Sequence, residues 1–214
     1  MHPSESAPIR IPDICLQRID TLLSRGGRRI LGIAAPPGAG KSTLAEALAR
    51  YFDARVQIVP MDGFHLANSE LQRLGRHTRK GAADTFDGDG FVDLMRRIKS
   101  QPATEQIYAP EFRRELEEAI AGAIAVDAAT PLVITEGNYL LLDEMPWRSL
   151  RAVLDEVWYL DVDERLRHQR LLMRHMRFGR SQQEALDWIA QTDEPNALRI
   201  AAQRHRADLC LRWD

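Results

Sequence analysis

A glycine-rich segment constrains the fold of this chain more than any other feature. Residues 32–52 read GIAAPPGAGKSTLAEALARYF, and the loop in this segment follows an apolar run. Helical periodicity begins at Lys41 and continues through Leu44, Leu48 and Phe52. A loop of this composition packs poorly and directs backbone N–H groups outward at a helix N-terminus, where anions bind. The order of strand, loop and helix therefore predicts an anion-binding turn.

The anion that best fits this loop is ATP. The stretch APPGAGKST supplies most of a pattern in which glycines admit phosphate oxygens, a lysine reaches the β- and γ-phosphates, and a hydroxyl holds Mg²⁺. Ala35 replaces the first glycine of the pattern, which costs roughly 1 kcal/mol or more only if a positive φ is needed there. A plain Gly/Pro turn before a helix is the alternative. We predict nucleotide binding by Pro37, Gly38, Ala39, Gly40, Lys41, Ser42 and Thr43.

Four short apolar runs indicate an α/β fold. Each run is almost continuously apolar and is bounded by turn or helix signals, as expected of strands buried on both faces of a parallel sheet. Helical periodicity precedes the first run at residues 12–25 and dominates residues 163–206. The apolar runs are residues 29–35, 56–61, 131–137 and 156–162.

Loops and breaks between these patterns predict a lid. Residues 75–90 are polar and rich in Gly and Asp, which marks a long loop. The last helical region is interrupted at residues 177–181 and at residues 192–196. The first interruption allows residues 164–182 to act as a hinged lid. We expect residues 1–12 to be flexible.

Composition favours one domain with small-molecule partners. A chain of 214 residues, 44% of them hydrophobic, can bury one core, so we expect a single domain over residues 1–214. Its 29 basic and 31 acidic residues nearly cancel, which argues against a nucleic-acid or membrane partner. No apolar stretch approaches the ~18 residues of a membrane span. Two cysteines without CxxC spacing suit a reduced cytosol, so we expect a cytoplasmic protein, and the sequence leaves open whether it forms a homodimer.

Two carboxylates follow apolar runs. Asp62 lies in VPMDGFH and Glu136 lies in LVITEGNYLLL, at the strand ends where open α/β sheets bind ligands. Asp62 suits a group that orients or deprotonates an attacking hydroxyl, or binds Mg²⁺ through water. Glu136 suits Mg²⁺ coordination beside Ser42, or assistance to Asp62. The alternatives are a turn at Asp62 and a surface ion pair at Glu136.

Arginines and a polar loop supply further candidates. Spacings of four and three place Arg170, Arg174 and Arg177 on one helical face, where guanidiniums can converge on phosphates. Most helical charge runs are solvated faces, so we expect only one or two of these arginines to act. The loop order Arg-Lys-Gly at residues 79–81, followed by DTFD, fits either phosphate and hydroxyl binding or an exposed loop without a ligand.

The ordered set of motifs resembles one kinase family. The segments GIAAPPGAGKST, VPMDGFH, RKGAADTFD, LVITEGNYLLL and RHMRFGRS look like the P-loop kinases that include uridine kinase, phosphoribulokinase and bacterial pantothenate kinase. The resemblance covers residues 30–211 and is strongest to a bacterial branch labelled fructose transport system kinases or nucleoside/nucleotide kinase family proteins. It implies a P-loop NTPase fold of the nucleoside monophosphate kinase type, with three α/β/α layers, a five-stranded parallel core sheet and a helical lid.

The resemblance also implies residue roles. The candidate base of the family's DGF motif falls on Asp62, and its EG glutamate falls on Glu136. A basic residue close to substrate in pantothenate kinase falls on Lys80, and the lid arginines fall on Arg170 and Arg174.

Departures from the family bear on the substrate. Pantothenate kinases carry Tyr-Ser-His where this chain has Tyr-Ala-Pro at residues 108–110, and Glu46 replaces an arginine of their phosphate-loop helix. Uridine kinases open the DGF region with Asp-Ser-Phe-Tyr, whereas residues 62–65 read Asp-Gly-Phe-His. Neither pantothenate nor uridine is therefore favoured, and a sugar or another small polyol remains open.

We predict an enzyme that moves the γ-phosphoryl group of ATP, with Mg²⁺, to a hydroxyl of a small metabolite. A GTPase switch would carry an Asn-Lys-x-Asp motif, which the sequence lacks, and an ATPase motor would end its acidic strand in Asp-Glu, whereas this strand ends in Thr-Glu-Gly at residues 135–137. A degenerate nucleotide-binding protein stays open because of Ala35. The expected site comprises the catalytic residues Lys41, Asp62, Glu136, Arg170 and Arg174, the substrate-binding residues Asp62, His65, Lys80 and Tyr108, and the metal-binding residues Ser42 and Glu136.

Overall fold

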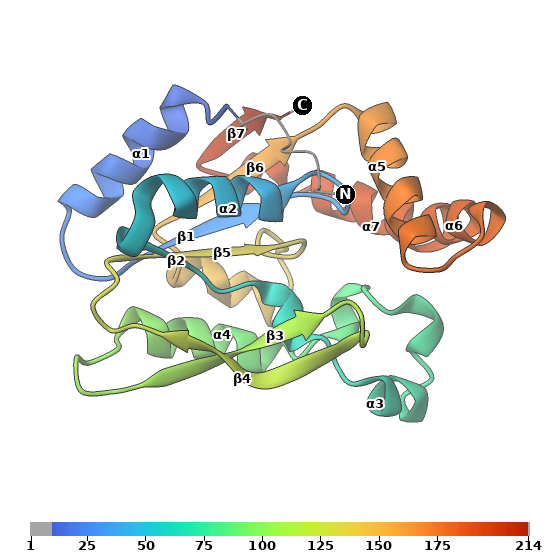
Figure 1. Ribbon diagram of the computed structural model, residues 1–214, viewed down its shortest axis with the longest axis horizontal. Helices are drawn as coiled ribbons and strands as arrows, with labels where there is room; N and C mark the ends of the chain where they lie inside the picture. The colour runs from blue at the N-terminus through green and yellow to red at the C-terminus, as the bar shows by residue number, and fades with distance from the viewer. Residues whose placement is uncertain (1–9, 214) are drawn as a thin grey trace, which may run out of the picture.

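The computed structural model describes residues 10–213, which form a parallel sheet with helices on both faces (Figure 1). Within these residues the main sheet has five strands in the order β2-β5-β1-β6-β7, all parallel. The fold is the three-layer α/β/α arrangement predicted from the sequence. The strands are β1 (Arg29–Ala34), β2 (Val56–Ile58), β5 (Leu132–Gly137), β6 (Glu156–Asp161) and β7 (Leu209–Arg212).

Helices cover the sheet and extend beyond its carboxyl edge. The α-helices are α1 (Asp13–Ser24), α2 (Lys41–Phe52), α3 (Asn68–Arg73), α4 (Gly88–Lys99), α5 (Glu164–Arg177), α6 (Gln182–Trp188) and α7 (Glu194–Ala201). Short 3-10 turns are η1 (Asp53–Arg55), η2 (Met61–Phe64), η3 (His77–Arg79), η4 (Ala83–Thr85), η5 (Trp147–Ala152) and η7 (Arg204–Arg206), and η6 (Ile189–Asp193) is a π-helix.

The alternation of side chains along each strand divides the core into two layers. On β1, Leu31 and Ile33 pack toward α1 and α2, whereas Ile30 and Ala34 pack on the opposite side toward α4 and η5. Successive side chains of a strand point to opposite faces, so a strand covered on both sides must be apolar throughout. This requirement explains the continuous apolar runs of the sequence.

An antiparallel hairpin was not predicted from the sequence. Strands β3 (Ile107–Arg113) and β4 (Glu118–Val126) pair outside the main sheet and lie beside α4 (Figure 1). Most of β4 is exposed and rich in Ala, so it lacks the buried apolar run that marks a strand. Pro110 sits at an irregularity of the pairing between Ala109 and Glu111, as proline in sheets usually does.

Other sequence-based boundaries need correction. The interruption predicted at residues 192–196 is wrong, because η6 continues directly into α7. Pro195 lies in the first turn of α7, where a missing N–H does not break a helix. The strand predicted over residues 56–61 ends at Ile58. The expected flexibility of residues 1–12 falls mostly on residues 1–9, which lie outside the described part. In the described part, no helix is long and apolar enough to cross a bilayer.

Candidate active site

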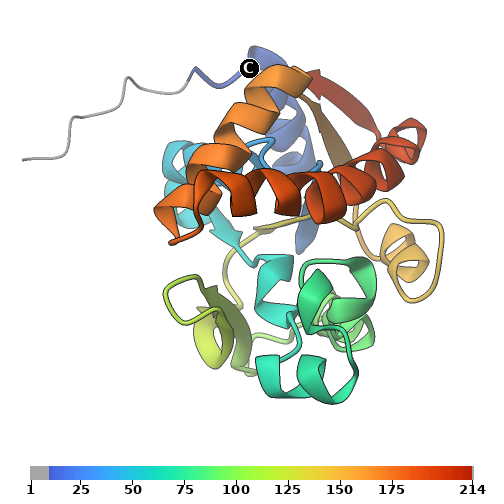
Figure 2. The ribbon, with the colours of Figure 1, turned by 90° about the vertical axis from the view of Figure 1, so that its right-hand side faces the viewer.

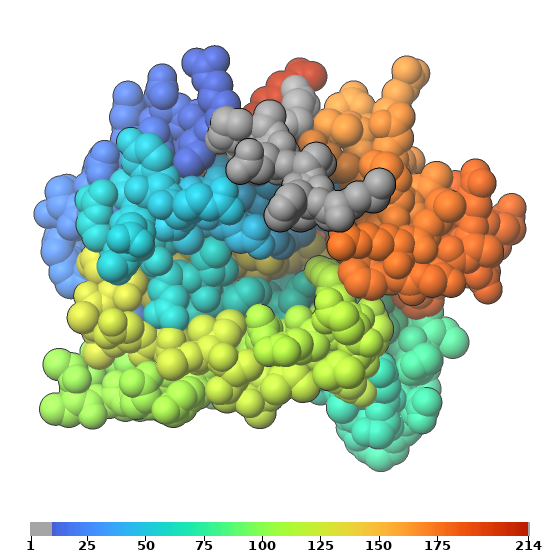
Figure 3. Space-filling view, viewed as in Figure 1, coloured from blue at the N-terminus to red at the C-terminus, as the bar shows by residue number. Residues whose placement is uncertain are grey.

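A cavity of about 880 Å³ lies at the carboxyl ends of β1 and β5. Helices α5 to α7 form one wall and the α3 region forms the opposite wall (Figure 2). The space-filling view shows the tip of the β3–β4 hairpin at the border between these walls (Figure 3). The cavity brings together the expected residues Pro37, Gly38, Gly40, Lys41, Ser42, Thr43, Asp62, His65, Lys80, Glu136, Arg170 and Arg174.

Two residues expected in the site, Tyr108 and Ala39, do not line the cavity. Tyr108 is 58% exposed on β3 and does not line the cavity. Phe112, four residues further along β3, lines the cavity, and the strand pairing shifts register between Ala109 and Glu111. Ala39 is fully buried, and its side chain packs in the core layer next to α1 and α2.

The phosphate loop requires glycine at two positions. Gly38 and Gly40 have φ values of 81° and 85°, in the left-handed region that favours glycine. A Cβ on Gly38 would also lie 2.7 Å from Cγ of Leu171, and one on Gly40 would lie 2.9 Å from Nε1 of Trp213. Ala35 is not among the residues with positive φ, so its substitution for glycine imposes no such strain.

Lys41 extends from the first turn of α2 across the loop. Its ammonium donates to the carbonyl oxygens of Ala35 and Pro36 at 3.1 and 3.2 Å and to Oδ1 of Asn138 at 2.6 Å. Burial lowers the pKa of Lys41, and the nearby carboxylate of Glu136 opposes this shift. Asn138 was not identified from the sequence, although its place two residues beyond Glu136 was the available signal.

Ser42 and Glu136 form a pair of oxygen donors beside the loop. The Ser42 hydroxyl donates to Oε1 of Glu136 at 2.8 Å. Glu136 is buried, and burial together with the charge of Asp62 raises its pKa. Oxygen donors of this kind suit Mg²⁺, which binds through one or two protein groups plus phosphates and water. These residues therefore fit a magnesium site.

Three other side chains lie close enough together to be considered as ligands of one cation. Glu164, His168 and Glu194 place ligand atoms within 4.8 Å of one another on α5 and α7. The guanidinium of Arg167 already donates to Oε2 of Glu194 at 2.5 Å. This cationic partner makes the cluster a poor cation site.

Asp62 lies in the 3-10 turn η2, beyond the end of β2, with its carboxylate in the cavity. Its Oδ2 is 3.4 Å from Nη2 of Arg114, which comes from the hairpin tip. Gly63 follows, and the backbone there approaches the hairpin so closely that a Cβ would lie 2.2 Å from the carbonyl oxygen of Pro110. This close approach holds η2 against the hairpin.

Helix α5, in the segment predicted to form a lid, presents two arginines to the cavity and turns a third away. Arg170 and Arg174 line the cavity, whereas Arg177 is exposed and does not. Nη1 of Arg170 is buried without a hydrogen-bond partner among residues 10–213. It would lie 3.9 Å from a Cβ on Gly40, so it faces the phosphate loop. A buried, unpaired guanidinium nitrogen beside this loop fits a phosphate oxygen.

Comparison with known proteins decides the family. A sequence model of the Phosphoribulokinase / Uridine kinase family matches residues 30–212. The chain belongs to this family. A Schizosaccharomyces pombe protein named "putative uridine kinase" is 32% identical over 210 residues, covering 93% of this chain and 89% of that protein. Membership of this family confirms the resemblance seen in the sequence. The chain is therefore a small-molecule kinase, and the family implies that it uses ATP.

Solved structures agree with this assignment. A crystal structure of a "putative fructose transport system kinase" from Silicibacter sp. TM1040 is 38% identical to this kinase, with a TM-score of 0.85. The match covers 93% of this chain and 97% of that chain. Phosphoribulokinase from Rhodobacter spheroides, at 12% identity, shares the fold with a TM-score of 0.62 over 86% of this chain and 70% of that one.

Aromatic rings line the side of the kinase cavity opposite the lid. The ring of His65 lies between those of Phe86 and Phe112, with centroids 4.0 and 4.5 Å away. Its Nδ1 is 2.8 Å from the carbonyl oxygen of Asp62. Burial in this stack lowers the pKa of His65, which favours a neutral ring. His65 therefore ties the backbone of Asp62 to the aromatic wall.

The neutral state of His65 predicts an acid-sensitive fold. Below pH ~6.5 the unfolded chain binds a proton that folded His65 resists, so stability falls as the pH falls. The loss attributable to this group is at most about 1.4 kcal/mol per pH unit. We expect His65→Phe to lose less stability than wild type between pH 7.5 and pH 5.5, as measured by urea unfolding. Parallel losses in the two proteins would contradict the assignment.

The contact between Gly63 and Pro110 predicts a cost for any side chain at position 63. We expect Gly63→Ala to lower the free energy of unfolding by about 1–3 kcal/mol, as overpacking does, and to reduce activity by moving Asp62. Gly75→Ala is the control, because its Cβ would meet nothing within 4 Å. It should cost only about 1 kcal/mol, for its positive φ. Urea unfolding measures both, and equal losses would contradict the steric explanation.

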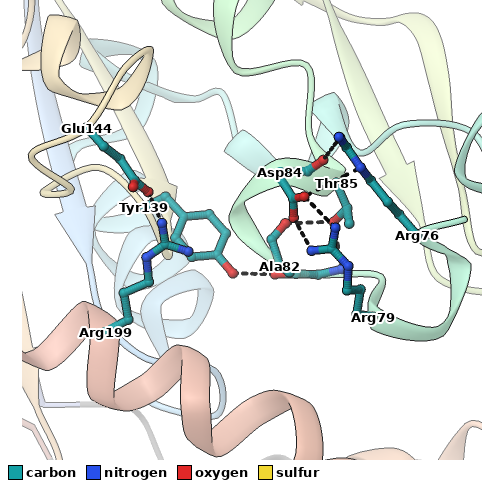
Figure 4. Close-up of polar contacts among 9 residues, drawn as sticks. Arg76, Arg79, Ala82, Asp84, Thr85, Tyr139, Glu144 and Arg199 are labelled. Carbon is teal, nitrogen blue, oxygen red and sulfur yellow. Dashed lines mark hydrogen bonds and ion pairs between the residues drawn. The ribbon is translucent and has the colours of Figure 1, made fainter. Parts of the chain in front are cut away.

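The basic and acidic residues of the long loop mainly pair with each other (Figure 4). Arg79 pairs with the carboxylate of Asp84, and Arg76 donates to the Asp84 carbonyl oxygen at 2.8 Å. These three residues line a second cavity instead of the main one. The hydroxyl of Tyr139 donates to the carbonyl oxygen of Gly81 and so anchors the loop beside Lys80. Of the loop cations at residues 79 and 80, only Lys80 reaches the main cavity.

A second row of lid residues was not identified from the sequence. His175 Nε2 lies 2.7 Å from Oδ2 of Asp193, and the guanidinium of Arg180 stacks 3.8 Å above the ring centre of Trp188. All four side chains line the cavity. Asp193 comes from the π-helix η6, a type of turn frequent at functional sites. These contacts join α5 to η6 and the turn after α5 to α6, so they depend on how these segments fold together.

Proposed function

We propose that this kinase transfers the γ-phosphoryl group of ATP to a hydroxyl of a small metabolite, with Asp62 orienting the attacking hydroxyl. The supporting observation is convergence: Lys41, Asp62, Glu136 and Arg170 come from four separate elements and line one cavity. Phosphoryl transfer depends mainly on positioning and on neutralising charge, and this set of groups suits both tasks. We further propose a single domain in which residues 164–182 form the lid.

The phosphate end of the cavity is built from the loop and α2. Backbone N–H groups at the start of α2 bind phosphate oxygens, and Lys41 supplies a positive charge near the β- and γ-phosphates. Ser42 and Glu136 would hold Mg²⁺, which supplies further charge neutralisation on the phosphates. In this role the ammonium of Lys41 exchanges its carbonyl partners for phosphate oxygens.

The hydroxyl end is organised around Asp62. Its carboxylate accepts a hydrogen bond from the substrate hydroxyl and takes up the proton as the hydroxyl oxygen bonds to the γ-phosphorus and the bond from that phosphorus to the departing ADP breaks. Because η2 is tied to the hairpin and to His65, the carboxylate is held in position before the substrate arrives.

The lid completes the site. Arg170 and Arg174 bring two positive charges from α5 to the phosphate end, where charge develops during transfer. Closure of residues 164–182 over the cavity excludes water, which would otherwise compete with the hydroxyl.

The names of relatives suggest different acceptors. One relative carries the name uridine kinase and a solved neighbour carries the name fructose transport system kinase. The residues Asp62-Gly63-Phe64-His65 depart from the uridine kinase pattern, so we favour a sugar or a related polyol over a nucleoside.

A turnover screen tests the function. ATP consumption is measured with Mg²⁺, alone and with a panel of sugars, polyols, nucleosides and vitamins, and products are weighed by mass spectrometry. We expect one hydroxyl compound to stimulate turnover and to gain one phosphoryl group. ATP hydrolysis that no compound changes but a partner protein stimulates would instead indicate a switch or motor.

A further inference from the structure

We propose that the substrate of this kinase carries an anionic group, a carboxylate or a phosphate, in addition to its reacting hydroxyl, and that Arg114 and Lys80 bind this group. The inference rests on the proposed function, because it assigns a substrate class to the same cavity. It limits the sugars and polyols favoured above to their acids and phosphate esters.

Arg114 faces the open cavity from the hairpin tip. Its side chain is 42% exposed, and it follows β3 directly. Its one ion pair among residues 10–213 is with Asp62, at 3.4 Å, near the long end of the hydrogen-bond range. A guanidinium has five N–H donors, so most donors of Arg114 are available to a ligand.

Lys80 lines the same cavity, and the direct hydrogen-bond partners of its ammonium carry no negative charge. Its ammonium donates to Oδ1 of Asn68 at 2.7 Å and to the backbone carbonyl oxygen of Glu117, and both partners are neutral oxygens. It also lies 5.1 Å from the ring centre of Phe112. Burial lowers the pKa of Lys80, although Glu117 and Glu118 oppose the shift. These contacts hold the cation in place and leave one of its three N–H groups for a ligand.

The cations of the cavity also repel one another. The pKa of Arg174 is lowered first by burial and then by the charge of Arg114, so these guanidiniums lie close enough to interact. The same two arginines lower the pKa of Lys41. A triphosphate compensates Lys41 and Arg174 at the phosphate end. At the hydroxyl end, within residues 10–213, Arg114 pairs only with Asp62, and the direct hydrogen-bond partners of Lys80 are neutral oxygens, with the charges of Glu117 and Glu118 nearby.

Substrate binding increases the uncompensated positive charge at the hydroxyl end of the cavity. When Asp62 takes up the proton of the attacking hydroxyl, it loses the negative charge that it presents to Arg114. A neutral polyol or nucleoside would then leave Arg114 without an anionic partner, and Lys80 with only the charges of Glu117 and Glu118 near it, in a partly desolvated cavity, which is unfavourable. A carboxylate or phosphate on the substrate compensates both cations through charge-assisted hydrogen bonds. The anion therefore also frees Asp62 for the hydroxyl.

Binding of inorganic phosphate tests this inference without knowledge of the substrate. The kinase is saturated with Mg²⁺ and a non-hydrolysable ATP analogue, and phosphate is titrated by calorimetry. We expect binding to wild type and a loss of about tenfold or more in Arg114→Gln, as expected for a hydrogen bond to a charged group. Arg113→Gln is the matched control, because Arg113 pairs with Glu111 at 2.8 Å and does not line the cavity. Equal binding in the two variants, or no binding to wild type, would overturn the proposal.

Turnover of matched pairs gives a second readout. Glycerol is compared with glycerate, ribose with ribose 5-phosphate, and fructose with fructose 6-phosphate. We expect the charged member of a pair to be phosphorylated, and Arg114→Gln to raise its KM about tenfold or more with a smaller change in kcat. A higher kcat/KM for the neutral member would overturn the anionic class and leave the proposed kinase reaction intact. A fall in kcat alone would instead place Arg114 at the transferring phosphoryl group.

Discussion

Replacement of Asp62 by asparagine is expected to lower kcat by about 10²- to 10⁴-fold, the usual contribution of a positioned acid–base group. Asparagine has nearly the same shape but cannot take up the hydroxyl proton. ATP binding should change little, because Lys41 and the loop N–H groups bind the phosphates. The measurements are kcat with the acceptor found by screening and the affinity for a non-hydrolysable ATP analogue.

The matched control for this substitution is Asp93→Asn. Asp93 is exposed on α4, where it pairs with Arg96 at 2.7 Å, and it lies outside the cavity. This variant should keep wild-type kcat. If folded Asp62→Asn, with intact ATP binding, turned over its acceptor at the wild-type rate, Asp62 would have no part in the reaction.

Replacement of Lys41 by methionine is expected to lower kcat/KM for ATP by about 10²- to 10³-fold, as loss of one preorganised charge-stabilising donor does. Methionine fills similar space but carries no charge, so the developing charge on the phosphates loses its nearest protein cation. The carbonyl oxygens of Ala35 and Pro36 lose this donor in the variant, so its folding is measured as well. Steady-state kinetics and circular dichroism give the two measurements.

Lys99 provides a contrasting substitution. Its ammonium pairs with Asp155 away from the cavity, and Asp155 also accepts hydrogen bonds from Arg29 at 3.0 Å and from the backbone of Ile30 at 2.7 Å. Lys99→Met should therefore reduce stability and leave kcat/KM unchanged. A Lys41→Met protein with normal kcat/KM would show that the loop lysine does not serve the phosphates.

Local sequence patterns determined much of the fold and of the phosphate site. The apolar runs of β1 and β5 follow from burial on both faces, and the loop at Gly38 and Gly40 needs a backbone that glycine adopts readily. The carboxylates of Asp62 and Glu136 could be placed because the ends of parallel strands meet at one edge of a sheet. Each of these inferences depends on neighbours in sequence or on strand direction alone.

The hydroxyl end of the site depended on tertiary structure. Asp62 and Arg114 are separated by 52 residues, and Lys41 and Asn138 by 97, so no local pattern indicates that they meet. Phe112 of the hairpin lines the cavity and Tyr108 does not, although both side chains belong to β3. The sequence alone determined four of the five strands of the main sheet, the phosphate loop and the two acids, because backbone geometry and burial act over a few residues. Only the folded chain decided which cations surround Asp62, because contacts between distant segments depend on how the hairpin, loop and lid pack together.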